Sequence, residues 1–184
     1  QRRGGGRGGR QAGADTPSDL GAWLNSDEEG VVTVYTGKAE VGQNIRTSLT
    51  QVVAEELPAP LDSIRLVMGD TDLTPYDRGT FGSRTTSTMA PQLRKAAAAA
   101  RKLLIELAAE CWNVERDSIV VADGKVTHRK TDQSLGFGQL TKGQKLMKII
   151  GEDAPTTPAK HWKIAGTSKG QRQRYCHRTA SLHL

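Results

Sequence analysis

The spacing of apolar residues along the chain predicts several short strands. Residues 22–25 and 31–36 lie on either side of Asp27-Glu28-Glu29-Gly30, a pattern typical of a β-hairpin. Residues 64–68 alternate between apolar and polar positions as a further strand. Residues 118–122 and 125–128 flank an Asp-Gly turn, which predicts a second hairpin.

A helical period follows the first hairpin. Asn44 can cap a helix that runs to about Leu57, where Pro58 and Pro60 stop it. Gln51 falls on the polar side of this helix, where water is expected to satisfy its amide. The apolar face holds Ile45, Leu49, Val52, Val53 and Leu57.

A longer helical period runs from about Met89 to Trp112, with Thr88 as its cap and Pro91 in its first turn. Its predicted buried stripe consists of Met89, Leu93, Ala96, Ala100, Leu103, Leu107 and Cys111. Residues 141–157 are expected to form a short helix and a proline-rich linker. The order of all these elements indicates an α+β fold, in which a mixed sheet carries helices packed on one face.

Composition narrows the class of protein. The chain has 184 residues, enough for one domain, and only 4% of them are aromatic. The net charge of +6 first suggests a nucleic-acid partner. However, residues 1–10 and 160–184 hold ten of the 26 basic residues and no acidic ones, which leaves 16 basic and 20 acidic residues between them. This mildly acidic body argues against nucleic acid, and the lack of an apolar run of about 18 residues argues against a membrane span.

Two glycine-containing loops, each between a predicted strand and a helix, are the candidate binding elements. The first is Val41-Gly42-Gln43-Asn44, and the second is Gly79-Thr80-Phe81-Gly82-Ser83-Arg84-Thr85-Thr86. Helix N-termini and free backbone N–H groups attract anions, so each loop can seat a phosphate or oxyanion. Turn formation and helix capping explain the same patterns, and neither loop is a known nucleotide motif. Asp70 and Asp72 are interpreted as turn or capping groups, and the residues predict no catalytic triad and no metal site.

Four segments in this order resemble the molybdopterin-binding subunit of the xanthine dehydrogenase/aldehyde oxidase family. They are residues 36–47 (TGKAEVGQNIRT), 53–57 (VAEEL), 69–72 (GDTD) and 79–85 (GTFGSRT). The resemblance extends from Leu20 to Lys169 and is greatest for the branch that contains the β-subunit of isoquinoline 1-oxidoreductase. It implies cofactor contacts at two groups of residues: Val41, Gly42 and Gln43, and Gly82, Ser83, Arg84 and Thr85.

The resemblance also implies a chemistry and a set of partners. The cofactor is molybdopterin, often as a cytosine dinucleotide in bacteria, and it supports insertion of a water-derived oxygen into a C–H bond of an N-heteroaromatic or an aldehyde. Electrons leave through a small iron–sulfur partner subunit with two 2Fe–2S clusters, and in this branch often reach a c-type cytochrome. A bacterial protein is implied, either cytoplasmic or periplasmic. Asn44 departs from the family's usual Gly, which puts a contact at this position in doubt.

The resemblance also implies that the chain lacks parts of the family's subunit. The family's catalytic Glu lies far downstream of these motifs in a longer subunit, and no segment matches it. The chain is therefore expected to be a truncated fragment without activity of its own. After Ala165-Gly166-Thr167-Ser168 the family continues into a hammerhead-like domain. Residues 170–184 can be back-translated into permitted codons that, read from their second base, encode that continuation at nearly every position. This agreement predicts a one-nucleotide frameshift near Lys169.

The expected organisation therefore has four parts. They are a disordered Gly/Arg-rich linker (1–19), a partial molybdopterin-binding domain (20–150), a linker toward a missing hammerhead-like domain (151–169) and a frameshifted tail (170–184). Two alternatives remain open: a nucleic-acid-binding protein that uses its basic ends, for which 1–19 would be an RNA-binding arm, and a non-catalytic assembly module. Salt titration of any nucleic-acid binding and co-purification with an iron–sulfur partner separate them.

Overall fold

A three-stranded sheet forms the centre of the fold. The computed structural model describes residues 17–142 and 154–168. β1 (Leu24–Ser26) pairs antiparallel with β2 (Val32–Thr36), and β2 pairs parallel with β3 (Ile64–Met68). Val32, Val34 and Thr36 are buried, whereas the alternate residues of β2 are half-buried. One face of the sheet therefore packs on the core, as the period of two requires, and the predicted mixed sheet is confirmed.

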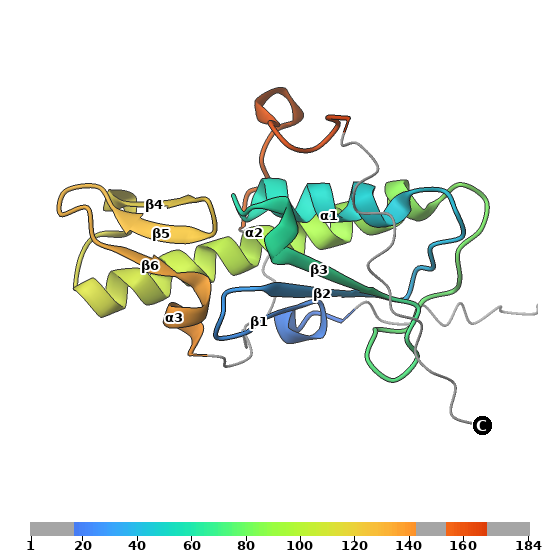
Figure 1. Ribbon diagram of the computed structural model, residues 1–184, viewed down its shortest axis with the longest axis horizontal. Helices are drawn as coiled ribbons and strands as arrows, with labels where there is room; N and C mark the ends of the chain where they lie inside the picture. The colour runs from blue at the N-terminus through green and yellow to red at the C-terminus, as the bar shows by residue number, and fades with distance from the viewer. Residues whose placement is uncertain (1–16, 143–153, 169–184) are drawn as a thin grey trace, which may run out of the picture.

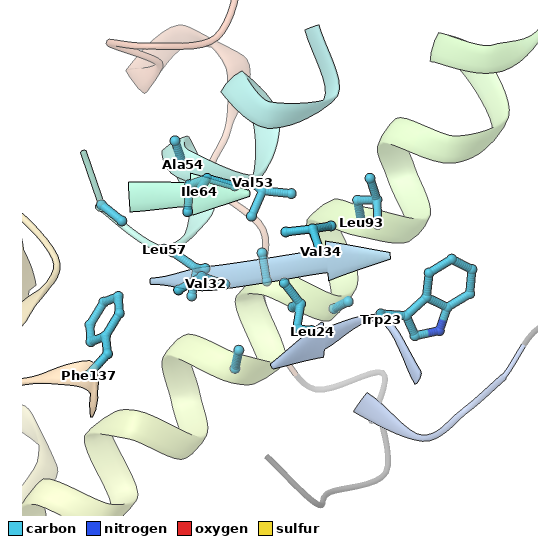
Figure 2. Close-up of a cluster of buried hydrophobic side chains, with 14 of the residues drawn as sticks. Trp23, Leu24, Val32, Val34, Val53, Ala54, Leu57, Ile64, Leu93 and Phe137 are labelled. Atoms are coloured by element: carbon cyan, nitrogen blue, oxygen red, sulfur yellow. The ribbon is translucent and has the colours of Figure 1, made fainter. Parts of the chain in front are cut away.

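Two helices, α1 (Ile45–Glu56) and α2 (Thr85–Trp112), lie side by side along this sheet (Figure 1). Their apolar faces and the sheet enclose the main core, which Figure 2 shows in close-up. The alanines between residues 96 and 100 are all buried, which allows α2 to pack closely. The predicted α+β fold with helices on one face of a mixed sheet is thus confirmed.

A second sheet lies at the far end of α2. It contains β4 (Ile119–Ala122), β5 (Lys125–His128) and β6 (Ser134–Gly136), all antiparallel. The β4–β5 hairpin matches the prediction, whereas β6 and the short helix α3 (Phe137–Thr141) were not predicted. Phe137 is fully buried in the same core as the first sheet. Short 3₁₀ helices span Leu20–Ala22, Leu61–Ser63, Arg116–Ser118 and Ala159–His161.

The long helix ends at Trp112 as predicted, but its start and the buried face of its second half differ from the prediction. It begins at Thr85, four residues before Met89, so Thr88 is not its cap and Pro91 lies inside it. From residue 101 onward its buried residues are Leu104, Ala108 and Ala109, while Leu103 and Leu107 are half-buried and Cys111 is exposed. The prediction that Cys111 packs as a small apolar residue is therefore wrong. This half of α2 contacts the second sheet and α3, and the apolar period of the helix does not reveal these partners.

A segment far along the chain, residues 154–168, is docked on the two helices and is called the strap below (Figure 1). The carboxylate of Glu56 is fully buried and accepts hydrogen bonds from the Thr157 backbone N–H at 2.8 Å and from its hydroxyl at 2.9 Å. Arg94 donates to the same carboxylate at 2.8 Å and also lies over the ring of Trp162, 4.9 Å from its centroid. Buried polar groups are thus paired across the contact.

Glu55 and Gln51 continue this contact along α1. Glu55 accepts hydrogen bonds from three consecutive backbone N–H groups, those of residues 163–165. The Gln51 amide donates to the carbonyl oxygens of Ile164 at 3.0 Å and Thr167 at 2.8 Å. Gln51 is 7% exposed, so the prediction that water satisfies its amide is wrong. The strap covers the polar side of α1, and helical periodicity carries no information about such a distant partner.

Several expectations fall on residues that lie outside the described ranges. They are most of the Gly/Arg-rich tract, most of the helix and linker expected between 141 and 157, and the tail from 170 to 184. Within the described ranges, every helix is too short or too polar to cross a membrane.

Candidate functional site

The two candidate loops leave the same end of the central sheet. The first loop (residues 37–44) follows β2 and leads into α1, and the second loop (residues 69–84) follows β3 and leads into α2. Because β2 and β3 are parallel neighbours, their carboxyl ends lie together, and Figure 1 shows both loops at that end of the sheet. Ligands of α/β sheets often bind outside the carboxyl ends of parallel strands.

The stems of the two loops are joined directly. The Lys38 ammonium lies 2.7 Å from an Asp77 carboxylate oxygen and 2.8 Å from the Gly79 carbonyl oxygen. The Ala39 backbone N–H donates to the Thr80 hydroxyl at 2.7 Å. Lys38 and Asp77 are separated by 39 positions in sequence, and their side chains are only 9% and 11% exposed. The structure therefore brings the two predicted loops together at their stems.

A carboxylate occupies the N-terminus of α1. Glu40 accepts hydrogen bonds from the backbone N–H groups of Gly42, Asn44 and Arg46, at 2.9, 3.0 and 2.9 Å. Asn44 adopts a left-handed conformation and makes no side-chain cap, which corrects the predicted cap. Burial raises the pKa of the Glu40 carboxyl, but the backbone N–H groups of Arg46, Asn44 and Gly42 outweigh burial and lower this pKa below its usual value. The anion seat expected here is filled by the protein's own charge.

The Gln43 side chain braces the first loop. Its amide oxygen accepts a hydrogen bond from the Val41 backbone N–H at 2.6 Å, and its amide nitrogen donates to the Ala39 carbonyl oxygen at 3.0 Å. A glutamine amide has two N–H donors, so one donor remains after these contacts. Val41, Gly42 and Gln43 are all exposed, and a Cβ placed on Gly42 would meet nothing within 4 Å. The tip of this loop is therefore open to a ligand.

The second loop ends at the start of α2, where the nearby side chain is positively charged rather than negatively charged as at α1. Gly82 and Ser83 have positive φ angles of 63° and 53°, and Arg84 immediately precedes α2. Arg84 provides no side-chain cap, and the first turn of α2 contains no acidic residue. Gly82, Ser83 and Arg84 are exposed, whereas Thr85, the first residue of α2, is 7% exposed. This end combines a helix dipole with an exposed guanidinium, which favours an anion.

A cleft of about 360 Å³ lies beside the second loop. Its walls include Lys38, Asp77 and Phe81 from the loops, Arg84 from the helix start and Trp23 from the core. The volume lies within the range of small-molecule sites. Of the seven predicted cofactor-contact residues, Arg84 alone lines this cleft. The cleft therefore adjoins the predicted site only at the start of α2.

Both loops also expose apolar side chains. Within the described ranges the large exposed apolar residues are Val41, Leu73, Tyr76 and Phe81, all on the two loops. Tyr76 and Phe81 also line the cleft, where exposed apolar side chains are typical of a binding site. Asp70, in contrast, accepts hydrogen bonds from the N–H groups of residues 72 and 73, as expected for a turn group.

Sequence reasoning missed three residues of this site: Lys38, Glu40 and Asp77. An acid just before a helix is a known capping signal, so Glu40 could have been found from its distance to the start of α1. The Lys38–Asp77 pair joins two loops across 39 positions, and no local pattern signals such a contact. The cofactor-contact residues inferred from resemblance stay a prediction.

The central sheet, the helices packed on it and the two exposed loops define a small α+β domain. A family model described as the molybdopterin cofactor-binding domain matches residues 4–182, and the chain therefore belongs to this family.

Curated relatives and solved structures agree with this family. A nicotinate dehydrogenase subunit of Pseudomonas putida is 33% identical over 150 residues, which are 82% of this chain and 13% of that protein. The β-subunit of isoquinoline 1-oxidoreductase from Brevundimonas diminuta is 33% identical over 125 residues, 64% of this chain and 16% of that protein. CO dehydrogenase from Oligotropha carboxidovorans matches with a TM-score of 0.57 and 26% identity, over 64% of this chain and 15% of that chain. The chain thus spans about a seventh of the proteins it matches.

Proposed function

We propose that this chain forms part of the cofactor cradle in the molybdenum-binding subunit of a molybdenum hydroxylase. The observation that carries the proposal is the meeting of the two exposed loops at the carboxyl ends of β2 and β3. The bound cofactor would supply the metal centre at which a water-derived oxygen is transferred to a C–H bond. Relatives named for nicotinate and isoquinoline support an N-heteroaromatic substrate, with aldehydes as the other class.

The donor groups of the two loops fit such a cofactor unequally. The second loop offers Arg84, the start of α2 and the exposed ring of Phe81, which suit an anionic ligand that also carries rings. Thr85 is buried at the helix start, so its contact would run through its backbone N–H. The first loop offers one free amide donor of Gln43, beside the charged Glu40. We therefore place the most anionic part of the cofactor near Gly82–Thr85 and a neutral acceptor near Gln43.

We further propose that the catalytic glutamate lies outside these 184 residues. Three glutamates at or near the first loop and α1 are already committed: Glu40 binds three backbone N–H groups, and Glu55 and Glu56 hold the strap. A general base needs a free carboxylate within reach of the substrate. The remaining partners are an iron–sulfur subunit with two 2Fe–2S clusters and, beyond it, a c-type cytochrome. Subunit designations in the names of the relatives support a multi-subunit enzyme.

A pair of glutamine variants in the complete subunit tests the proposed site. Gln43→Ala removes the loop brace and the free donor, whereas Gln133→Ala changes an exposed glutamine in the turn before β6. The first variant loses the two brace bonds and the bond to the cofactor, each about 0.5–1.5 kcal/mol, so its molybdenum retention should fall about tenfold or more. A change at an exposed turn should stay within about 0.5 kcal/mol. Equal molybdenum content in the two variants, measured by elemental analysis, would refute the assignment of this loop.

A further inference from the structure

We infer that Lys38 and Asp77 are positioning residues that set the distance and orientation between the two cofactor loops. This inference rests on the proposed function, because it assigns the pair its role in the cofactor cradle. Neither residue needs to touch the cofactor. Their contact fixes the stems from which the two ligand-binding tips extend.

The geometry of the pair favours a defined arrangement. The Asp77 carboxylate oxygen that contacts the Lys38 ammonium also accepts a hydrogen bond from the Gly79 backbone N–H at 2.8 Å. The same ammonium donates to the Gly79 carbonyl oxygen, so both polar groups of Gly79 are held. Gly79 has a φ of 117°, a conformation that L side chains rarely adopt. The pair therefore holds the turn that leads directly to Gly82 and Ser83.

Backbone packing at the same place requires the loops to approach closely. A Cβ on Gly37 would lie 2.5 Å from the Asp77 Cβ and 2.7 Å from the Pro75 carbonyl oxygen, so no side chain fits. The Ala39–Thr80 hydrogen bond lies next along the chain on both loops. Three neighbouring contacts thus join residues 37–39 to residues 75–80.

Burial distinguishes this pair from an ordinary surface ion pair. Exposed pairs contribute little, whereas removal of one partner from a buried pair leaves an uncompensated charge. The side chains of Lys38 and Asp77 are each about nine-tenths buried. Loss of either charge is therefore expected to release the second loop from the first.

The test compares Lys38→Met with Arg94→Met in the complete subunit. Arg94 belongs to another largely buried ion pair, on the strap side of α1 and α2, and controls for general destabilisation. Amide hydrogen exchange of residues 79–86 should accelerate about tenfold in Lys38→Met and remain unchanged in Arg94→Met, at similar thermal stability. Lys38→Arg, which keeps charge and donors, should restore much of the protection. Thr80→Val, a milder change, should accelerate exchange in the same segment to a smaller degree, and it replaces Lys38→Met if that variant does not fold.

Molybdenum content is measured on the same samples and separates the two ideas. If the wild-type protein binds the cofactor but Lys38→Met and Thr80→Val alter neither exchange in residues 79–86 nor molybdenum content, the positioning role is overturned and the proposed function stands. If the wild-type protein contains no molybdenum, the proposed function fails, and faster exchange in Lys38→Met still supports the tie between the loops.

Discussion

Replacing Glu56 by Gln is expected to loosen the strap and lower the stability of the chain. Glu56 is fully buried, and all its partners are donors: Arg94, Arg101 and the Thr157 backbone and hydroxyl. Glutamine keeps the shape of the side chain but turns an N–H₂ group toward those donors and removes the charge that faces two guanidinium groups. The substitution therefore leaves the network without one acceptor and without its anion.

The expected loss of stability depends on how deeply Glu56 and its partners are buried. Removing one member of a fully buried pair costs about 3–5 kcal/mol. The side chains of Arg94 and Arg101 are each 22% exposed, so water can solvate them in part, and we expect a loss of about 2–4 kcal/mol. In a domain of this size, such a loss lowers the thermal midpoint by roughly 5–15 °C.

Urea unfolding of the chain, followed by circular dichroism, measures this effect. Glu110→Gln is the matched control, because Glu110 is an exposed glutamate near the end of α2 and should change stability by less than about 0.5 kcal/mol. Trypsin cleavage at Lys160 and Lys163, both within the strap, should also accelerate in Glu56→Gln. Indistinguishable unfolding midpoints for the two variants would show that the strap does not depend on Glu56.

Three further outcomes are expected. The 184-residue chain alone should not oxidise N-heteroaromatics or aldehydes in a dye-linked assay, because the catalytic glutamate is proposed to lie elsewhere; measurable turnover would contradict this. Glu40 has a folded-state pKa below the usual 4.5, so its contribution to stability is present above that pH and is lost as the pH falls through the lowered value. Glu40→Gln should therefore lower the free energy of unfolding more at pH 7 than at pH 3 in urea titrations. An equal loss at the two pH values would exclude a capping role for the Glu40 carboxylate. The DNA around codon 169 should regain a reading frame that continues the family sequence, whereas stop codons in every frame would refute the frameshift.

The sequence predicted those parts of the fold that local periodicity determines. The strands and the extent of α1 follow from alternation, helical spacing and prolines, and the structure confirms them within a few residues. The start of α2 was placed too late because residues 85–88 are polar and carry no apolar period. The short strand β6 and helix α3 were missed because Leu135, Phe137 and Leu140 are spread over two short elements and give neither a clear apolar period.

Long-range polar contacts account for the remaining differences between the predictions from sequence and the structure. Gln51, Glu55 and Glu56 have the appearance of a solvated helix face, and only the strap, more than 100 positions later, explains their burial. The two loops themselves could be identified from their glycines and their place before helices. Which backbone N–H groups remain available to a ligand could not be predicted, because that depends on how Glu40 folds back on the first loop.

The central claim is that this chain helps to bind a molybdenum cofactor. The most direct measurement is the molybdenum and pterin content of the complete subunit, purified with its iron–sulfur partner and analysed by elemental analysis and by fluorescence of the released pterin. One molybdenum and one pterin per subunit are expected, with both reduced in Gln43→Ala. A folded, partner-bound subunit that contains neither would contradict the claim.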